Sequence, residues 1–470
     1  MTTGLAAGGA DHRAAASPLR RVLGFWAVAS IVVGNMLGSG VFFTPGELSA
    51  VANATWQVYL LWALAGGITL CGALTLSELA SRLPRAGATY HIIREGFGPF
   101  WAFVLIWVQI WVAGPGSIAG VAIVVGEFLV RFGGGLERWS PPAWGTAAVT
   151  FFVGINLLGV QWGGRTQILL TTAKVAGLLG LVGGSLFLAD AVVQQGAVAA
   201  GSTATAAHIG GVWAFIRFVG LGIAAVLFTY DGWIDVSYLG AEIERPQRNL
   251  PLGLTCGVAT VTLLYLVVNY AYLRVVPLDA MRAAPAAVAT EVARAAFGAS
   301  GGRWLNMLVF VSIVGALGGL VMTLPRLYYA AAVQYAAEAP AASASFLFRG
   351  LSTVSTRTAV PAGSLVFAGV TTIVALWTFG TFSRIVNFFV VPLQLTNILI
   401  VAAVFRARRE PPPPGSFRTP GYPIVPLIFI VVILAFLASA IIFNPLETFI
   451  GAALTATAAP AYIWTKRRSQ

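Results

Sequence analysis

Charged residues are scarce in this sequence. They make up 9% of its 470 residues, while 58% of the residues are hydrophobic, and soluble domains carry about a quarter charged residues. Such a surface would not stay dissolved in water, so the composition excludes an ordinary soluble protein. Apolar runs of about 20 residues, the length of a helix that crosses a bilayer, recur along nearly the whole chain. We therefore expect an all-α integral membrane protein in contact with the lipid bilayer.

Cysteine and histidine are also scarce, with two and three residues in the whole sequence. Cys71 and Cys256 lie inside apolar runs, away from the loop positions that a disulfide or a zinc site would need. The histidines, His12, His91 and His208, are expected in the tail or in loops, which excludes a His-based catalytic or metal site within the membrane. We expect no enzyme activity, no catalytic residue, no metal and no cofactor.

The basic residues predict how the chain is oriented. The net charge is +12, but the 28 Lys and Arg residues are spread over many short loops, so no nucleic-acid partner is expected. With the N-terminus inside, 19 basic residues fall on the inner side and 8 on the outer side. Because basic residues are retained on the cytoplasmic side, we predict a multi-pass protein of the cytoplasmic membrane with both termini in the cytoplasm.

Twelve transmembrane helices are predicted from the apolar runs. They are expected at residues 24–52, 56–80, 98–130, 143–161, 166–189, 212–243, 252–275, 303–335, 360–379, 383–405, 423–443 and 446–465. The first ten are expected to form a core of residues 23–408. If they are two repeats of five, about 23–190 and 210–408, the odd number makes the second repeat enter the membrane from the opposite side, which gives an inverted repeat.

Two terminal segments flank this core. Residues 1–22 lack the apolar stretch of a signal peptide and are expected to form a disordered cytoplasmic tail. Residues 409–470 are expected to hold a cytoplasmic Pro-rich loop, helices 11 and 12, and a short basic C-terminus.

The first predicted helix is interrupted by glycine. Gly34, Gly38 and Gly40 fall within seven residues in the middle of an apolar run, which weakens the helix there. Unwound backbone in lipid costs several kcal/mol for each unpaired group unless it lines a polar cavity or binds a ligand. The break therefore predicts a site, although Gly34 and Gly38 also have the small-xxx-small spacing of closely packed helices.

The sixth predicted helix carries a second interruption. Asp231 and Gly232 lie in the middle of its apolar run, where an unpaired charge is costly. Asp231 could cap the second half of the helix, a role compatible with binding. Two interrupted helices in corresponding positions are the sequence pattern of a transporter binding site.

Helix ends at such breaks suit a zwitterion, because free N–H groups attract a carboxylate and C-terminal carbonyls accept from an ammonium group. Ser39 and Gly40 would hold the carboxylate, and carbonyls near Met36 and Thr229 would accept from the α-amino group. The substrate side chain would point into an apolar pocket, where small residues of the eighth predicted helix would leave room: Ala316, Gly318 and Gly319.

At these breaks the sequence resembles the amino acid, polyamine and organocation superfamily, most closely its L-type amino acid transporter branch and the bacterial relatives of that branch. The resemblance covers nearly the whole chain. It is carried by Gly38-Ser39-Gly40-Val41-Phe42 and Phe228-Thr229-Tyr230-Asp231-Gly232-Trp233, with further matches at residues 84–90, 97–99, 241–243 and 246–251. It implies a leucine-transporter-type fold of 5+5 inverted repeats, with helices 1 and 6 unwound at the midplane of the membrane.

The resemblance also implies roles for single residues. Lys174 matches a fifth-helix lysine of sodium-independent members, whose ammonium group occupies the place of a sodium ion; its expected partners are carbonyls near Gly34 and the hydroxyl of Ser312. Phe228 matches an aromatic residue that closes over the substrate as a gate. The predicted substrate-binding residues are Met36, Gly38, Ser39, Gly40, Phe228, Thr229, Tyr230, Asp231 and Gly232.

Two departures from the L-type pattern are visible. Many animal members have glycine at the position of Asp231, so its charge could alter the substrate range or add proton coupling. The segment 131–142 has no cysteine, whereas the animal light subunits use one there to bond a glycoprotein. No covalently linked heavy subunit is implied.

We expect sodium-independent transport of amino acids, in particular neutral L-amino acids, by alternating access as an exchanger or a uniporter. One alternative is a proton-coupled symporter of amino acids or polyamines, in which Lys174 or Asp231 carries the proton. Another is a membrane sensor that binds an amino acid without moving it.

Overall fold

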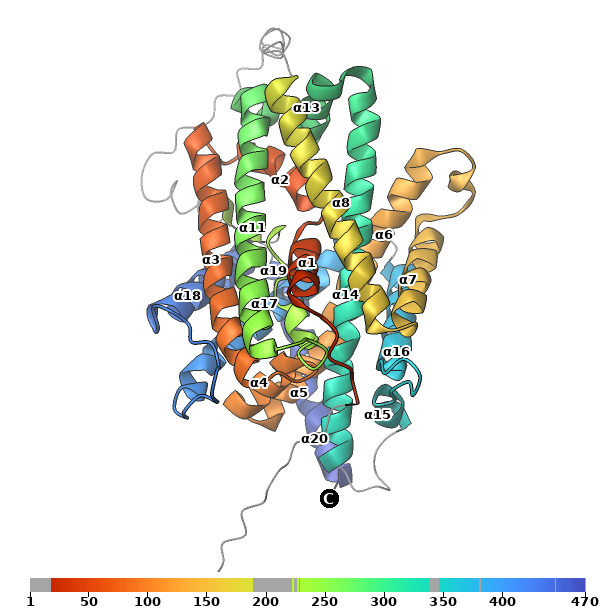
Figure 1. Ribbon diagram of the computed structural model, residues 1–470, viewed down its shortest axis with the longest axis vertical. Coiled ribbons are helices and arrows are strands. Elements are labelled where there is room, and N and C mark those ends of the chain that lie inside the picture. The colour runs from red at the N-terminus through yellow and green to blue at the C-terminus, as the bar shows by residue number, and fades with distance from the viewer. Residues whose placement is uncertain are drawn as a thin grey trace, which may run out of the picture.

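The computed structural model describes residues 18–188, 222–223, 226–227, 229–338, 346–379, 382–443 and 445–469. Within these residues the chain is helical and has no β-strand, only two isolated bridges. Four long helices run side by side along the long axis of the molecule (Figure 1). They are α3 (Thr55–Arg82), α8 (Val160–Phe187), α11 (Pro246–Val275) and α14 (Gly301–Glu338).

The first apolar run forms two helices, as its glycines predict. Helix α1 spans Phe25–Met36 and α2 spans Gly40–Ser49, and their axes differ by 42° at the break. Most of α1 is buried, and it contacts α8, α11 and α14. Figure 1 shows α1 between these long helices, at the centre of the molecule. The break therefore lies inside the protein and not against lipid.

Shorter helices complete the N-terminal part of the fold. They are α4 (Ala88–Phe97), α5 (Pro99–Val108), the π-helical turn η1 (Gln109–Ala113), α6 (Gly114–Phe132), the 3₁₀ turn η2 (Leu136–Arg138) and α7 (Pro141–Leu157). The helix predicted at 143–161 ends at Leu157, and the one predicted at 166–189 begins at Val160. Gly159 separates them with a φ of +134°, which an α-helix cannot contain.

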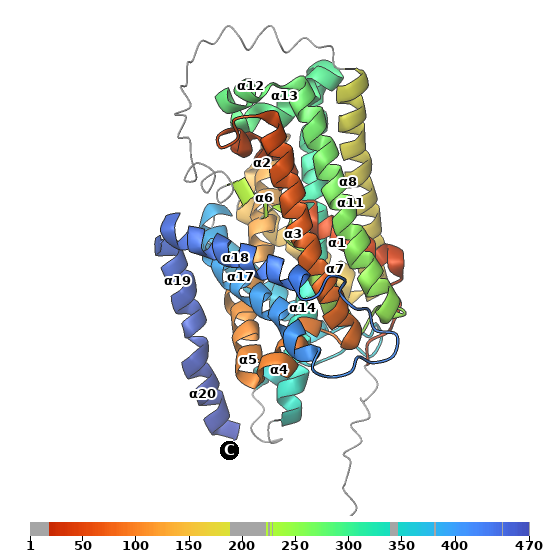
Figure 2. The same ribbon diagram turned by 90° about the vertical axis from the view of Figure 1, so that its left-hand side faces the viewer.

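The C-terminal part has a similar set of elements. They are η4 (Asp235–Tyr238), α12 (Leu278–Ala283), η5 (Pro285–Ala287), α13 (Val288–Phe297), η6 (Gly298–Ser300), α15 (Phe346–Leu351), α16 (Ala362–Phe379), α17 (Phe382–Ala407), α18 (Ile424–Phe443), α19 (Pro445–Ala456) and α20 (Ala458–Ser469). Figure 2 shows α19 and α20 as a column beside the main bundle, where both contact α5.

Two predicted helices differ from the structure in this part. The helix expected at 446–465 is divided into α19 and α20, because Pro460 has no N–H and fits only the first turn of a new helix. Much of the helix expected at 212–243 lies outside the described residues. Its described end, after Thr229, has only the 3₁₀ turn η4, because Gly232 adopts a φ of +95°.

The described residues contain five helical stretches long and apolar enough to cross a membrane, or six if α1 and α2 form one bent span. Shorter apolar helices occur at Ala362–Thr378, Val391–Ala407 and Ile424–Ser439. The outward faces carry large apolar side chains such as those of Trp56, Leu169 and Leu263. These features identify a multi-pass membrane protein; the count of twelve helices stays a prediction.

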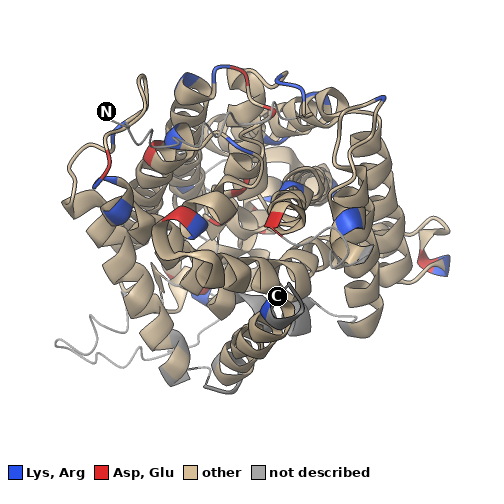
Figure 3. Cartoon of the chain, turned by 90° about the horizontal axis from the view of Figure 1, so that it is seen from below, with Lys and Arg blue, Asp and Glu red and all other residues tan. Residues whose placement is uncertain are grey.

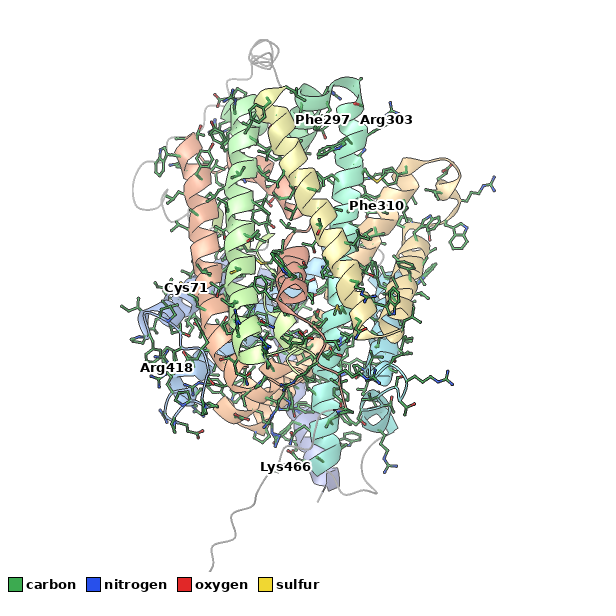
Figure 4. The ribbon with its side chains drawn as sticks, viewed as in Figure 1. Cys71, Phe297, Arg303, Phe310, Arg418 and Lys466 are labelled. Carbon is green, nitrogen blue, oxygen red and sulfur yellow. The ribbon has the colours of Figure 1, made fainter. Side chains whose placement is uncertain are left out.

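Charged residues gather at the ends of the bundle. Seen from below, they lie mainly at helix ends and connecting segments, and most of the helical ribbon carries no charge (Figure 3). Figure 4 shows Arg303 at the upper end of the molecule and Arg418 and Lys466 at the lower end. The structure thus separates Arg303 from Arg418 and Lys466 along its long axis, and the side of the membrane on which each end lies stays a prediction.

A buried ion pair closes the lower end beneath α1. Arg326 of α14 contacts Glu242 through two N–O pairs at 3.0 and 3.2 Å, and neither side chain is exposed. The Glu242 carbonyl also accepts hydrogen bonds from the amides of Val22 and Leu23. The segment before α1, the segment after η4 and α14 are therefore held together at one point.

A second buried carboxylate ties the loop after α17 to α3. The Glu78 carboxylate, which is fully buried, lies 2.6 Å from Arg408 Nη2 and 3.0 Å from Arg82 Nη2. It also accepts the backbone N–H of Thr419 at 2.8 Å. Because the buried Glu78 carboxylate is paired with arginines, a Pro-rich loop can lie against the end of a membrane helix without an uncompensated negative charge.

Glu242→Gln is expected to destabilise the protein by about 3–5 kcal/mol, because it leaves the Arg326 guanidinium buried without a counter-charge. The change is measured as a loss of thermal stability of the purified protein in detergent. Glu291→Gln is the matched control, since the Glu291–Arg294 pair is exposed and such pairs contribute about 0–1 kcal/mol. Equal thermal shifts in the two variants would contradict this reading of the buried pair.

Candidate functional site

A cavity of about 160 Å³ lies beside the break between α1 and α2. An engineered protein cavity of about 150 Å³ admits benzene, so this space is sufficient for a small organic molecule. The cavity is lined by Asn35, Met36, Gly38, Ser39, Gly40, Gln109, Ser117, Gly120, Val121, Val124, Thr229, Asp231, Gly232, Ile234, Asp235, Tyr238, Ile313, Ala316, Leu320, Leu324, Leu393 and Asn397. Residues distant in the sequence therefore meet at the break predicted from the glycines.

Most of the predicted substrate-binding residues line this cavity, and one does not. Tyr230 is absent from the lining; its ring packs against those of Trp62 and Tyr265, which also contact each other, and its hydroxyl donates to the Trp62 carbonyl at 3.1 Å. It is therefore a packing residue of α3 and α11 and not a wall of the cavity. Phe228, the predicted gate, lies outside the described residues.

The start of α2 faces the cavity. The first amide groups of an α-helix have no acceptor within the helix and carry partial positive charge, and the residues at this start, Ser39 and Gly40, line the cavity. A Cβ atom on Gly40 would lie 2.6 Å from Thr229 Oγ1, so only glycine allows this close approach. The start of α2 can therefore receive an anionic group beside Thr229.

Tyr265 joins the two broken segments. Its hydroxyl lies 2.8 Å from the Met36 carbonyl oxygen and 3.1 Å from the Thr229 carbonyl oxygen. These are the carbonyls expected to accept from an α-amino group, and the Met36 carbonyl also accepts the N–H of Gly38 at 2.9 Å. The sequence contains no signal for Tyr265, since it is one tyrosine within an apolar helix.

Gly232 brings the second interrupted segment against α1. It adopts a φ of +95°, and a Cβ atom there would lie 3.1 Å from the carbonyl carbon of Asn35. Asn35 in turn donates from Nδ2 to Asp235 Oδ2 at 3.0 Å. Both the positive φ of Gly232 and its close approach to Asn35 therefore require a residue without a side chain. On either side of this contact, Asp231 and Asp235 line the cavity.

Lys174 is fully buried beneath the same break. Its ammonium group donates to the carbonyls of Gly34 at 2.7 Å and Leu37 at 2.9 Å. The Ser312 hydroxyl donates to the Leu37 carbonyl as well, at 3.2 Å. Gly315 makes room for the lysine, since a Cβ atom there would lie 2.4 Å from Lys174 Cε. No carboxylate of the described residues forms an ion pair with Lys174.

A family model described as amino acid permease matches residues 23–464. The chain belongs to the amino acid permease family. It is 31% identical to the serine/threonine exchanger SteT of Bacillus subtilis over 67% of this chain and 68% of that one. It is 28% identical to the b(0,+)-type amino acid transporter 1 of Mus musculus over 79% and 72%, and 25% identical to the cystine/glutamate transporter of Homo sapiens over 93% and 84%. The family predicted from the two breaks is confirmed.

The prediction that small residues of α14 leave room for the substrate side chain is partly wrong. Ala316 lines the cavity, but Cβ atoms on Gly318 and Gly319 would meet Phe152 and the Asn35 side chain at 2.7 and 1.7 Å. These two glycines therefore allow neighbouring side chains to approach α14 and do not widen the pocket. The cavity wall is also more polar than expected, and the unexpected polar residues are Asn35, Gln109, Ser117, Asp235, Tyr238 and Asn397.

Residues of the types that bind metal ions, His, Cys, Asp and Glu, form no metal-binding cluster in the described part of the permease. No group of three or more His, Cys, Asp or Glu side chains there could hold a metal ion. His91 lies on α4 and not in a loop as expected. Burial, with the nearby Arg85 and Arg94, lowers the pKa of its imidazole to about 4, so His91 is uncharged at neutral pH.

Gly232→Ala is expected to reduce amino acid uptake by about tenfold or more, since a side chain at this φ costs about 1–3 kcal/mol and displaces Asn35 from Asp235. Uptake into cells is compared at equal amounts of permease in the membrane. The control is Gly154→Ala on α7, where an added Cβ meets no atom within 4 Å. Normal uptake by Gly232→Ala would show that the contact with Asn35 is dispensable.

Tyr265→Phe is expected to lower the stability of the permease by about 0.5–1.5 kcal/mol, because it removes a buried hydrogen bond to the carbonyls of the two breaks. Tyr270→Phe on the same helix is the control, since Tyr270 is half exposed and the change should have little effect. Thermal unfolding of both variants in detergent provides the comparison. Indistinguishable stabilities would rule out the Tyr265 hydroxyl as a link between the two breaks.

Proposed function

We propose that this permease is a sodium-independent amino acid exchanger that works by alternating access. The observation that supports this most directly is the pair of hydrogen bonds from the Lys174 ammonium group to the Gly34 and Leu37 carbonyls. A sodium ion bound at a broken helix needs such carbonyl oxygens as ligands. Since a fixed ammonium group uses them and repels a second cation, substrate binding would not need sodium.

The substrate site of the proposal is the cavity beside the break. An amino acid would place its carboxylate at Ser39 and Gly40, at the start of α2. Its ammonium group would donate to the Met36 and Thr229 carbonyls and lie near the Asp231 carboxylate. Gly38 and Gly232 would let the two backbones approach the ligand, and Phe228 would close over it. Gly34, Lys174 and Ser312 would hold the break in place from below.

The proposed architecture is the leucine-transporter type, with twelve helices, a ten-helix core at 23–408 in two inverted repeats, and both termini in the cytoplasm. The break inside the bundle and the long helices around it are what such a core requires. Exchange is favoured over uniport by the name of one relative, the serine/threonine exchanger. The segment 131–142 has no cysteine, so the proposal includes no heavy subunit linked there.

The test is counterflow in liposomes that contain the purified permease, in sodium-free buffer at equal pH on both sides. Radiolabelled alanine is expected to enter when unlabelled amino acid is inside and to enter much more slowly when it is absent. Lys174→Met, which keeps the apolar stem and removes the ammonium group, is expected to lose at least about tenfold in rate, since hydrogen bonds to a charged group contribute about 1.5–3 kcal/mol each.

Lys466→Ala is the matched control, because Lys466 is the other lysine of the chain and is exposed. Uptake that requires sodium, or full activity of Lys174→Met, would contradict the proposal. Uptake driven only by an inward proton gradient would establish the proton-coupled alternative. Binding of amino acids to the permease without any uptake would establish the sensor.

A further inference from the structure

The cavity contains more carboxyl groups than the α-ammonium group of one ordinary amino acid can pair, a point that rests on the proposed function. Asp231 and Asp235 both line it, and none of the ion pairs among the described residues includes either carboxylate. The α-carboxylate of an amino acid is matched by the start of α2, and its α-ammonium group can offset one aspartate. The second carboxyl group then either carries a proton or takes a cation from the ligand, because an uncompensated buried charge is strongly unfavourable.

Asp235 is the carboxylate without an assigned partner. Its side chain is 8% exposed, and the hydrogen bond from Asn35 Nδ2 engages only Oδ2. No other hydrogen bond of the described residues reaches this carboxylate, so Oδ1 keeps its capacity to accept from a ligand. Asn35 is itself 9% exposed, and its Oδ1 atom has no partner in the structure. Asp235 Oδ1 is therefore an acceptor on the cavity wall without a donor, whereas Asn35 Oδ1 faces Gly319 of α14.

The remaining wall suits an extended aliphatic stem. Branched aliphatic side chains line much of the cavity, and Gln109 and Asn397 line it as well. The main chain at Gln109 is held in a π-helical turn, where its carbonyl accepts from the Tyr328 hydroxyl at 2.9 Å. The aliphatic lining residues are Val121, Val124, Ile313, Leu320, Leu324 and Leu393. Apolar walls with one carboxylate fit a methylene chain that carries a terminal cation.

We propose that Asp235, positioned by Asn35, binds a cationic group on the substrate side chain, and that the preferred substrates are amino acids with a basic side chain, such as lysine and ornithine. The sequence prediction of neutral amino acids followed the resemblance to the L-type branch, and it did not consider Asp235. In the proposed complex Asp231 offsets the α-ammonium group and Asp235 offsets the side-chain cation. The titratable groups that line the cavity with Asp235 are Asp231 and Tyr238.

The experiment compares lysine with norleucine, which has the same straight carbon skeleton without the terminal ammonium group. Each is added as a competitor of radiolabelled alanine counterflow in liposomes containing the full-length permease, in sodium-free buffer at equal pH on both sides. In the wild-type permease lysine is expected to inhibit at a concentration roughly tenfold to a hundredfold lower than norleucine, the range for a hydrogen bond to a charged group. This comparison needs no variant.

Asp235→Asn is expected to bring the two inhibitory concentrations within about threefold of each other by weakening inhibition by lysine alone. Asp235→Glu keeps the charge and is expected to keep part of the preference for lysine. Asp279→Asn is the control, since Asp279 lies in α12, outside the cavity, and its side chain is 91% exposed. The Asp279→Asn variant should prefer lysine over norleucine as strongly as the wild-type permease does.

Each other outcome overturns the inference in an identifiable way. If neutral amino acids exchange but lysine inhibits no better than norleucine in the wild-type permease, the inference is wrong while the proposed function stands. Equal weakening of both inhibitors by Asp235→Asn would assign Asp235 a structural role. Loss of the pH dependence of exchange in Asp235→Asn, without a change in the lysine preference, would assign its charge to a proton. No exchange of any amino acid would overturn the proposed function as well.

Discussion

Backbone groups that lose their helical partners inside a membrane must find others, and this constraint governs the centre of the molecule. The break after Met36 frees carbonyls for which no water is present in lipid. Donors from three surrounding helices reach them: Lys174 from α8, Tyr265 from α11 and Ser312 from α14. These helices are the long ones that surround α1, so the same hydrogen bonds that satisfy the break also fix the arrangement of the bundle around it.

Buried charged groups follow the same rule that a buried polar group needs a partner. At the lower end, the carboxylates of Glu242 and Glu78 are paired with arginines that are distant in the sequence. At the break, Lys174 relies on carbonyl dipoles instead of a carboxylate. The cavity is the exception, because Asp231 and Asp235 have no arginine or lysine partner among the described residues. Under alternating access the paired lower end would have to separate, while the hydrogen bonds at the break can persist.

Much of the fold follows from properties that are local in the sequence. Apolar runs indicate where membrane helices lie, because lipid tolerates only continuous helices of sufficient length. The apolar runs predict the ends of these helices less accurately than their positions. The positive φ of Gly159 separates α7 from α8. Pro460, in the first turn of α20, separates that helix from α19. The count of twelve helices and the repeat symmetry depend on segments that lie partly outside the described residues.

The sequence by itself determined the membrane character, the break in the first helix and the meeting of Ser39, Gly40 and Asp231 at one cavity, because glycine and charge inside apolar runs are rare and costly. Only the tertiary structure decided which polar groups face that cavity. Asp235 and Tyr265 have ordinary sequence surroundings, and Tyr230 belongs to a motif yet points away. The reason is geometric: outside regular helices the direction of a side chain depends on the packing of helices far apart in the chain, and not on its sequence neighbours.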